Sequence, residues 1–179
     1  MKNFKTVLFG ENIILKKLEL KYAQEIYKLR QDTDVTKFLP NKYHNGKKKT
    51  EDYIKNNIEK WKKKKTLNYV ILLSNRAAGM IMLSKLDFKN LNCELGVWLG
   101  KEFWHKKIAN EAAHLLLKYA FNELNMERVY FLINQNNIAS IKFFEKIGAK
   151  KEGLLRRAGY IDGKFEDKFV YSILKEEFR

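Results

Sequence analysis

The part of the sequence best suited to hold an anion is a polar turn that leads into a long amphipathic helix. Leu99 to Leu124 reads LGKEFWHKKIANEAAHLLLKYAFNEL, and its apolar spacing predicts a helix from about Ile108. The run before it, Cys93 to Leu99, is typical of a strand. A strand, a turn and a helix start in this order direct unpaired backbone N–H groups at a phosphate, and Lys106 and Lys107 add two cations there. Taken alone, these lysines also fit an ordinary solvated pair at a helix start.

The elements that must position this turn follow from hydrophobic spacing. A strand, a helix and a strand with a short return, from Cys93 to Ile133, predict a parallel pair, whereas the preceding hairpin turn predicts antiparallel pairing. The sequence therefore predicts a mixed sheet within one domain over residues 1–179. The predicted strands are Asn12–Leu18, Leu67–Leu73, Met80–Leu86, Cys93–Leu99, Arg128–Ile133, Lys150–Leu155 and Phe165–Leu174. The predicted helices are Leu20–Gln31, one capped by Thr50, one from Ile108, and one that Asn136 or Asn137 caps and that ends at Ile147.

Length and composition argue against several classes of protein. The 179 residues, 45% of them hydrophobic, suffice for one domain with a substantial core. No apolar run reaches the roughly 20 residues of a membrane helix, and the N-terminus lacks a signal-peptide region, so we expect a cytoplasmic protein without a membrane partner. Cys93 is the single cysteine, and His44, His105 and His114 lack zinc-ligand spacing, which argues against a metal site.

The formal net charge of +15 attracts anionic partners. Nucleic acid is one such partner, and the aromatic residues Tyr43, Tyr53 and Trp61 within basic segments fit that hypothesis. Lysines spread over solvated faces explain the same charge, and charge alone does not define a site. Nucleic-acid binding is therefore the less favoured hypothesis.

Several short motifs, taken together, are similar to those of one known family. The chain resembles the GNAT N-acetyltransferases, and within them the branch of ribosomal-protein alanine acetyltransferases (RimJ/RimL type). The resemblance rests on the combination and covers nearly the whole chain. The motifs lie at Asn12–Leu18, Thr33–Pro40, Glu94–Trp104 (E-L-G-x-W-L-G-x-E-x-W), Ile108–Ala112 (I-A-x-E-A), Asn137–Ser140 (N-x-A-S), Phe144–Gly148, Lys151–Arg156 and Tyr160–Asp167.

The resemblance implies the fold and the acetyl donor. The fold would be an α/β (α+β) GNAT-like domain, whose mixed, mostly antiparallel sheet has a parallel pair splayed at the cofactor site and helices on both faces. The donor would be acetyl-CoA. The turn that binds its pyrophosphate in the family matches Trp104, His105, Lys106, Lys107, Ile108 and Ala109.

This turn departs from the family pattern, because Lys107 and His105 stand where the family and this branch have glycine, which lets the backbone approach phosphate closely. For the pantetheine arm, Asn137 would make contact from the facing helix, although alone it equally fits a helix cap. Backbone groups that would pair with the arm belong to Gly96, Val97, Trp98 and Leu99.

For catalysis, the resemblance implicates Glu94, which matches the glutamate of the family's strand motif and would remove the proton of the amine. Alone, Glu94 equally fits a surface strand residue paired with a lysine. Phe144 stands where many GNAT proteins have a tyrosine acid, and we expect it only to pack. Ser140, one turn earlier, would donate a proton to the leaving thiolate or stabilise the oxyanion. Tyr160 is a weaker alternative.

The leading hypothesis is an acetyl-CoA-dependent N-acetyltransferase that acts on a primary amine, a protein N-terminus or a small molecule, by direct attack in a ternary complex. A GNAT-like acyl-CoA-binding module that has lost catalysis is the alternative that Lys107 and Phe144 keep open. The acceptor stays open, as does the oligomeric state, a homodimer included. Asp32, Asp34 and Asp162 are few carboxylates for a strongly cationic acceptor.

Overall fold

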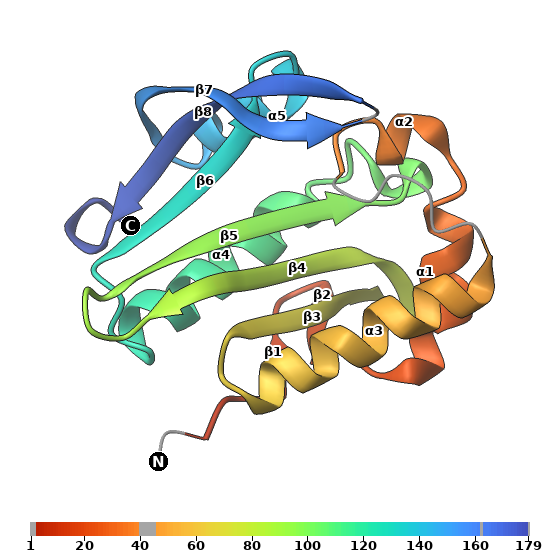
Figure 1. Cartoon of the computed structure of the whole chain (residues 1–179). Coiled ribbons are helices and arrows are strands. Elements are labelled where there is room, and N and C mark those ends of the chain that lie inside the picture. Colours follow the sequence, from red (N-terminus) through yellow and green to blue (C-terminus); the bar gives the residue numbers. More distant parts are fainter. Residues whose placement is uncertain (1–2, 40–45, 162, 179) are drawn as a thin grey trace.

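The computed structural model describes residues 3–39, 46–161 and 163–178, and these form one eight-stranded sheet with helices around it (Figure 1). The strand order is β1-β2-β3-β4-β5-β6-β8-β7. Every neighbouring pair is antiparallel except β5 and β6, which confirms the predicted mixed, mostly antiparallel sheet. The strands are β1 (Val7–Phe9), β2 (Ile13–Lys17), β3 (Thr66–Leu73), β4 (Arg76–Asp87), β5 (Asn92–Leu99), β6 (Arg128–Asn134), β7 (Lys150–Ile161) and β8 (Lys164–Leu174). The helices are α1 (Ala23–Leu29), α2 (Thr33–Thr36), α3 (Lys47–Lys62), α4 (Ile108–Asn122) and α5 (Ile138–Lys146), with short 3-10 turns at Leu20–Tyr22, Lys101–Phe103 and Lys175–Glu177.

Helices cover both faces of the sheet, and we name each face after its longest helix. On the α4 face, α4 and α5 pack against fully buried strand residues such as Val129 and Phe131. On the α3 face, α1 and α3 contribute Ile26 and Ile54 to a second cluster over β3 and β4. The strands β6, β8 and β7 extend beyond α1 and α3 on this face (Figure 1). Within the described ranges, no helix is both long and apolar enough to cross a bilayer.

The single cysteine lies in the core of the α4 face. Cys93 has no exposed surface, and burial raises the pKa of its thiol to about 12. The charged form of a thiol is disfavoured in an apolar interior, so this group stays protonated at neutral pH.

Several sequence predictions are confirmed and others are wrong. The helix from Ile108 and the Asn137 cap of α5 are confirmed. The strand predicted at Asn12–Leu18 is the second strand, because β1 precedes it and has only three residues, too few to show alternation. Thr50 is not a cap: α3 already begins at Lys47, and Thr50 is buried inside the helix. The final hairpin is longer than predicted on both strands.

A carboxylate of α4 closes the turn between β1 and β2. Glu111 Oε1 accepts hydrogen bonds from the backbone N–H groups of Asn12 (2.8 Å) and Ile13 (3.3 Å), and Oε2 accepts one from Asn12 Nδ2 (3.2 Å). Gly10 leaves room for this contact, since a Cβ there would lie 2.4 Å from Glu111 Oε1. The glutamate of the I-A-x-E-A motif therefore ties the start of α4 to the N-terminal hairpin.

We expect Glu111→Ala to lower the free energy of unfolding by about 1–3 kcal/mol, because two backbone N–H groups lose a charged acceptor. Urea unfolding followed by circular dichroism measures the loss. The control is Glu123→Ala at the other end of α4, where the carboxylate forms an exposed ion pair with Lys5 (2.8 Å) and should contribute far less. Equal losses in the two variants would contradict the structural role of Glu111.

Candidate active site

β5 and β6 separate after a short parallel pairing. The pairing joins Asn92–Glu94 to Arg128–Tyr130 and stops there. Beyond this point β5 stays with β4 as far as Leu99, while β6 stays with β8 as far as Asn134, so the two strands diverge (Figure 1). The edge of β5 from Leu95 to Leu99 that faces β6 therefore lies outside the β5–β6 ladder. We call this opening the splay.

The predicted pantetheine contacts lie along this edge of β5. Gly96, Val97 and Trp98 follow the last residue that is paired with β6. The carbonyl of Leu99 already accepts a hydrogen bond from Trp104 Nε1 (3.0 Å). The indole thus fixes the following turn to the end of β5, which is a structural role that the sequence motif did not reveal.

The turn before α4 adopts a backbone shape that favours glycine, although Trp104–Ala109 contains none. His105 and Lys107 have φ angles of 61° and 60°, in the left-handed region. Lys107 is the N-cap of α4, and the N–H of Glu111 bonds to its carbonyl (3.1 Å). The N–H groups of residues 108–110 precede this bond, so the helix itself does not use them and they can serve an anion.

The side chains of this turn divide between core and surface. Ile108 is buried in the core of the α4 face, so only its backbone can serve the anion site. His105, Lys106 and Lys107 are exposed, and Ala109 is half-buried. The two lysines thus add positive charge at the start of α4, where the helix dipole already favours anions.

Glu94 lies on the α3 face at the last paired position before the splay, opposite Tyr130 of β6 and Ser84 of β4. Its Oε2 forms an ion pair with Lys85 Nζ at 2.9 Å, and the Glu94 side chain is 22% exposed. The hydrogen bond to Glu94 raises the pKa of the Lys85 ammonium, so this group is charged at neutral pH. The pairing of Glu94 with a lysine is confirmed, and its role as base stays a prediction.

A β-bulge in β4 places Lys85 beside Glu94. The pairing of β4 with β5 shifts between Ser84 and Asp87, so Lys85 and Leu86 together oppose one residue of β5. Side chains alternate between faces in a regular strand, and the residue after Ser84 would point into the core of the α4 face. Leu86 packs against that core instead, and Lys85, with a φ of 49°, contacts Glu94. Lys85 was not among the predicted site residues, because one sequence gives no sign of a bulge here.

The start of α5 brings Asn137 and Ser140 together. Asn137 Oδ1 accepts a hydrogen bond from the backbone N–H of Ser140 (3.1 Å), which leaves the Asn137 amide nitrogen for another contact. Phe144 is buried, and its ring lies 4.3 Å from that of Phe131, so its packing role is confirmed. Ser140 is half-buried and lies one turn before Phe144 on the same side of the helix. Tyr160 is exposed on the hairpin of β7 and β8.

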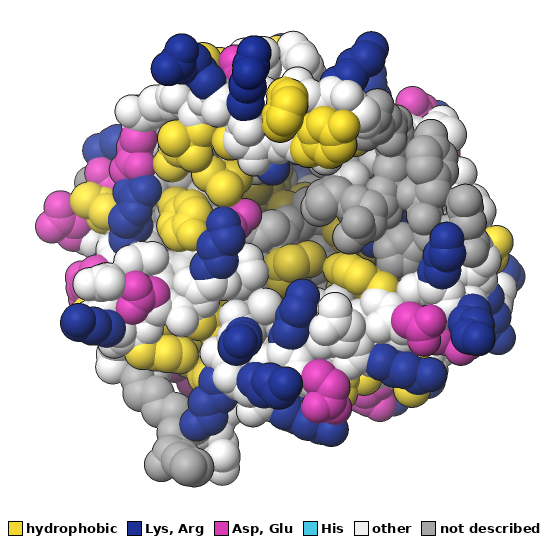
Figure 2. Space-filling view, viewed as in Figure 1, with side chains coloured by type: hydrophobic (Ala, Val, Ile, Leu, Met, Phe, Trp, Pro, Cys, Tyr) yellow, Lys and Arg dark blue, Asp and Glu magenta, His cyan; other side chains and the backbone are white. Residues whose placement is uncertain are grey.

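The α3 face is hollowed between this hairpin and α3, with hydrophobic side chains in the hollow and lysines and arginines around it (Figure 2). Two of the three carboxylates considered for a cationic acceptor, Asp32 and Asp34, already lie near the ammonium of Lys101. Asp34 Oδ2 lies 2.6 Å from Lys101 Nζ, and Asp32 Oδ2 lies 4.0 Å from it. The hydrogen bond from Lys101 lowers the pKa of Asp34. Asp162 lies outside the described residues.

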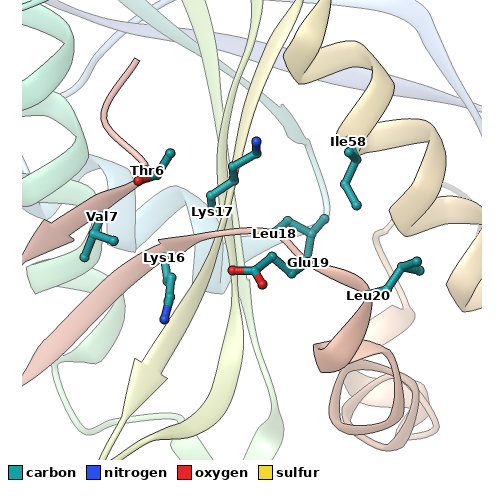
Figure 3. A pocket seen from close by; sticks show the side chains of 8 residues that line it. All are labelled: Thr6, Val7, Lys16, Lys17, Leu18, Glu19, Leu20 and Ile58. Atoms are coloured by element: carbon teal, nitrogen blue, oxygen red, sulfur yellow. The ribbon is translucent and has the colours of Figure 1, made fainter. Parts of the chain in front are cut away.

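A separate cavity of about 490 Å³ lies at the other edge of the sheet (Figure 3). It opens between β2 and α3, and β3 and β4 lie between it and β5 in the strand order. It is therefore distinct from the splay and contains none of the predicted site residues. Its lining consists of Thr6, Val7, Lys16, Lys17, Leu18, Glu19, Leu20 and Ile58.

Comparison with known proteins agrees with this geometry. The family model described as an acetyltransferase (GNAT) domain matches residues 12–150, which include the splay and the starts of α4 and α5. The chain belongs to the GNAT acetyltransferase family. This GNAT chain is 28% identical over 173 residues to the uncharacterized N-acetyltransferase p20 of Bacillus licheniformis, covering 96% of this chain and 97% of that protein.

Two further proteins to which the chain is similar differ in the acceptors that their names state. The spermidine N(1)-acetyltransferase of Escherichia coli is 24% identical over 110 residues, which cover 62% of this chain and 59% of that protein. The ribosomal-protein acetyltransferase RimL, solved in complex with coenzyme A, has a TM-score of 0.87 at 17% identity, covering 94% of this chain and 97% of that one. At this identity the second likeness shows the fold alone.

We expect Lys107→Gly to raise the free energy of unfolding by up to about 1 kcal/mol. A left-handed φ costs a non-glycine residue roughly 1–2 kcal/mol, and the extra freedom of glycine in the unfolded chain offsets part of the gain. The matched control is Lys106→Gly, because Lys106 is the exposed neighbour without a positive φ and should lose stability. Urea unfolding distinguishes the two, and a loss in both variants would contradict strain at Lys107.

Proposed function

We propose that this GNAT chain is an acetyl-CoA-dependent N-acetyltransferase that acts on a primary amine by direct attack in a ternary complex. The observation that carries the proposal is the splay, because it sets an unpaired strand edge beside two helix starts. The start of α4 suits a pyrophosphate, and the edge of β5 suits the amide groups of an extended arm. No metal or further cofactor is needed for this reaction.

The described residues fit acetyl-CoA at named positions. The backbone N–H groups of residues 108–110, with the charges of Lys106 and Lys107, would hold the pyrophosphate. Backbone groups of Gly96, Val97 and Trp98 would pair with the pantetheine arm, and the amide nitrogen of Asn137 would reach it from α5. The left-handed φ of Lys107 supports this fit, since the turn keeps the shape that the family achieves with glycine. When bound, acetyl-CoA supplies the acetyl group as a thioester.

Glu94 is the residue that we propose as base. A free amine is mostly protonated at neutral pH, so a carboxylate must take up its proton before attack. Glu94 lies on the α3 face, and α4 lies on the other, so an amine would approach Glu94 from the hollow while the donor is held across the sheet. The ammonium of Lys85, 2.9 Å from Glu94 Oε2, holds the carboxylate in one orientation.

Ser140 is the residue that we propose to assist the leaving group. Ser140 lies in the first turn of α5. It is on the same side of the helix as Phe144, which packs against the sheet. Phe144 has no proton to donate, so Ser140 is the hydroxyl that this helix offers. A thiolate is a good leaving group, and positioning of two bound substrates alone can supply much of the acceleration.

Two classes of acceptor remain in the proposal, a protein N-terminal amine and a small-molecule amine. The names of RimL and of the spermidine acetyltransferase represent one class each. Because Lys101 pairs with Asp34 and lies near Asp32, these carboxylates do not favour a polycation. A chain that binds acetyl-CoA without turnover is the second candidate, and the buried Phe144 in place of a hydroxyl favours it.

We expect acetyl-CoA to bind in calorimetry with an affinity that falls as salt rises, because charged groups hold the pyrophosphate. The double variant Lys106→Ala/Lys107→Ala should lose about 1–3 kcal/mol of binding free energy. The control Lys62→Ala/Lys63→Ala removes the same charge from the end of α3 and should bind as the wild type does. No binding at millimolar acetyl-CoA would overturn the proposed function. Coenzyme A release with a panel of amines separates an enzyme from a binding module.

We expect Glu94→Gln to lower turnover and to flatten the acidic limb of the pH–rate profile, with acetyl-CoA affinity nearly unchanged, because the variant loses the proposed base but none of the groups proposed to hold the cofactor. Stopped assays of coenzyme A release from acidic to alkaline pH, with the best amine of the panel, measure the profile. The control Glu59→Gln removes a carboxylate paired with Lys62 (2.6 Å) on α3. A wild-type profile in Glu94→Gln would assign the base to another residue.

A further inference from the structure

One buried amide in the structure has a hydrogen-bond donor that the fold does not use. Asn134 is 6% exposed, and its Nδ2 has no hydrogen-bond partner within the described ranges. A buried donor without an acceptor costs the fold roughly 1–3 kcal/mol. Such a group calls for a physical explanation, because most buried polar atoms in proteins are paired.

The rest of Asn134 is held firmly, which fixes the direction of this donor. Its Oδ1 accepts a hydrogen bond from the backbone N–H of Asn136 (2.9 Å), and its carbonyl accepts one from the N–H of Asn137 (2.9 Å). Rotation of the amide by half a turn would set two donors against each other, so the side chain cannot exchange its oxygen and nitrogen. The NH₂ group is therefore presented in one orientation.

Asn134 stands beside the splay. It is the last residue of β6, and it pairs with Lys168 of β8 rather than with β5. Side chains two and four residues apart lie on one face of a strand, so Asn134 shares the α3 face with Tyr130, which pairs with Glu94. Four residues of strand separate Asn134 from Tyr130 by about 13 Å. This places the free donor on the β6 side of the opening, just before the start of α5.

We infer that Asn134 Nδ2 donates a hydrogen bond to a carbonyl oxygen of a substrate bound in the splay. This inference rests on the proposed function and adds a binding residue to it. An amide NH₂ group only donates, so its partner is an oxygen and not an ammonium. Both substrates of an acetyl transfer to a peptide offer such an oxygen, in the amides and thioester of acetyl-CoA or in the backbone of the acceptor.

Asn57 provides the matched comparison. It is also 6% exposed, but its Nδ2 donates to the carbonyl of Tyr53 (2.9 Å) within α3. Replacement of this satisfied amide should lower stability, whereas replacement of the Asn134 amide removes an unsatisfied donor along with one satisfied acceptor. The same substitution at the two positions therefore distinguishes an amide that stabilises the fold from an amide that binds a ligand.

The experiment compares Asn134→Leu and Asn57→Leu in urea unfolding without ligand, and in calorimetry with acetyl-CoA as the probe. We expect Asn57→Leu to unfold at lower urea and to bind acetyl-CoA as the wild type does. We expect Asn134→Leu to unfold close to the wild type and to lose roughly tenfold in ligand affinity, the value of one hydrogen bond. Asn134→Ala removes the donor without adding bulk or charge, so it serves if the leucine variant folds poorly.

Two arms identify the substrate that carries the oxygen. A loss of acetyl-CoA affinity assigns it to the donor, whereas an unchanged affinity with a raised KM for the best amine of the panel assigns it to the acceptor. If the wild type binds acetyl-CoA, and Asn134→Leu has the same acetyl-CoA affinity and the same KM for the amine as the wild type, this inference alone is overturned. A wild type that does not bind acetyl-CoA would overturn the proposed function, and the inference with it.

Discussion

The pairing of β5 with β4 and of β6 with β8, rather than with each other, is the constraint on which the rest of the site depends. Each strand keeps its antiparallel neighbour along its full length, β4 for one and β8 for the other, and the two share only a short parallel contact. An unpaired strand edge inside a sheet would normally be covered, because its N–H and C=O groups are costly to bury. Here β5 and β6 lead toward the starts of α4 and α5, so the opening has backbone donors from β5 and α4 and the side-chain amide of Asn137 beside it.

The turn before α4 has a backbone conformation that favours glycine, although its residues are not glycines. His105 and Lys107 adopt left-handed φ angles that glycine would adopt with less strain. The surrounding contacts hold the turn in place, with Trp104 bonded to the carbonyl of Leu99 on one side and Ile108 buried on the other. The packing of this segment therefore stabilises the strained backbone. Lys107 also adds a positive charge that glycine lacks.

The sequence predicted those parts of the site that depend on local pattern. The helix from Ile108 and the Asn137 cap follow from apolar spacing and from the preference of asparagine for helix starts. The bulge at Lys85 was not predictable, because it arises from the register between two strands. The orphan donor of Asn134 was also invisible, since a missing partner is a property of the whole fold. The role of Glu111 was missed for the same reason: its partners lie about 100 residues earlier in the chain.

The burial of Cys93 has a practical consequence for work with this protein. Its thiol is enclosed by the core and stays protonated, so it reacts slowly with reagents that require an accessible thiolate. Coenzyme A carries a free thiol once its acyl group has left. A thiol-reactive dye will therefore report product without a background from the folded chain. A cysteine introduced on the surface will likewise take a fluorescent label at one place, with the native residue left in its natural state.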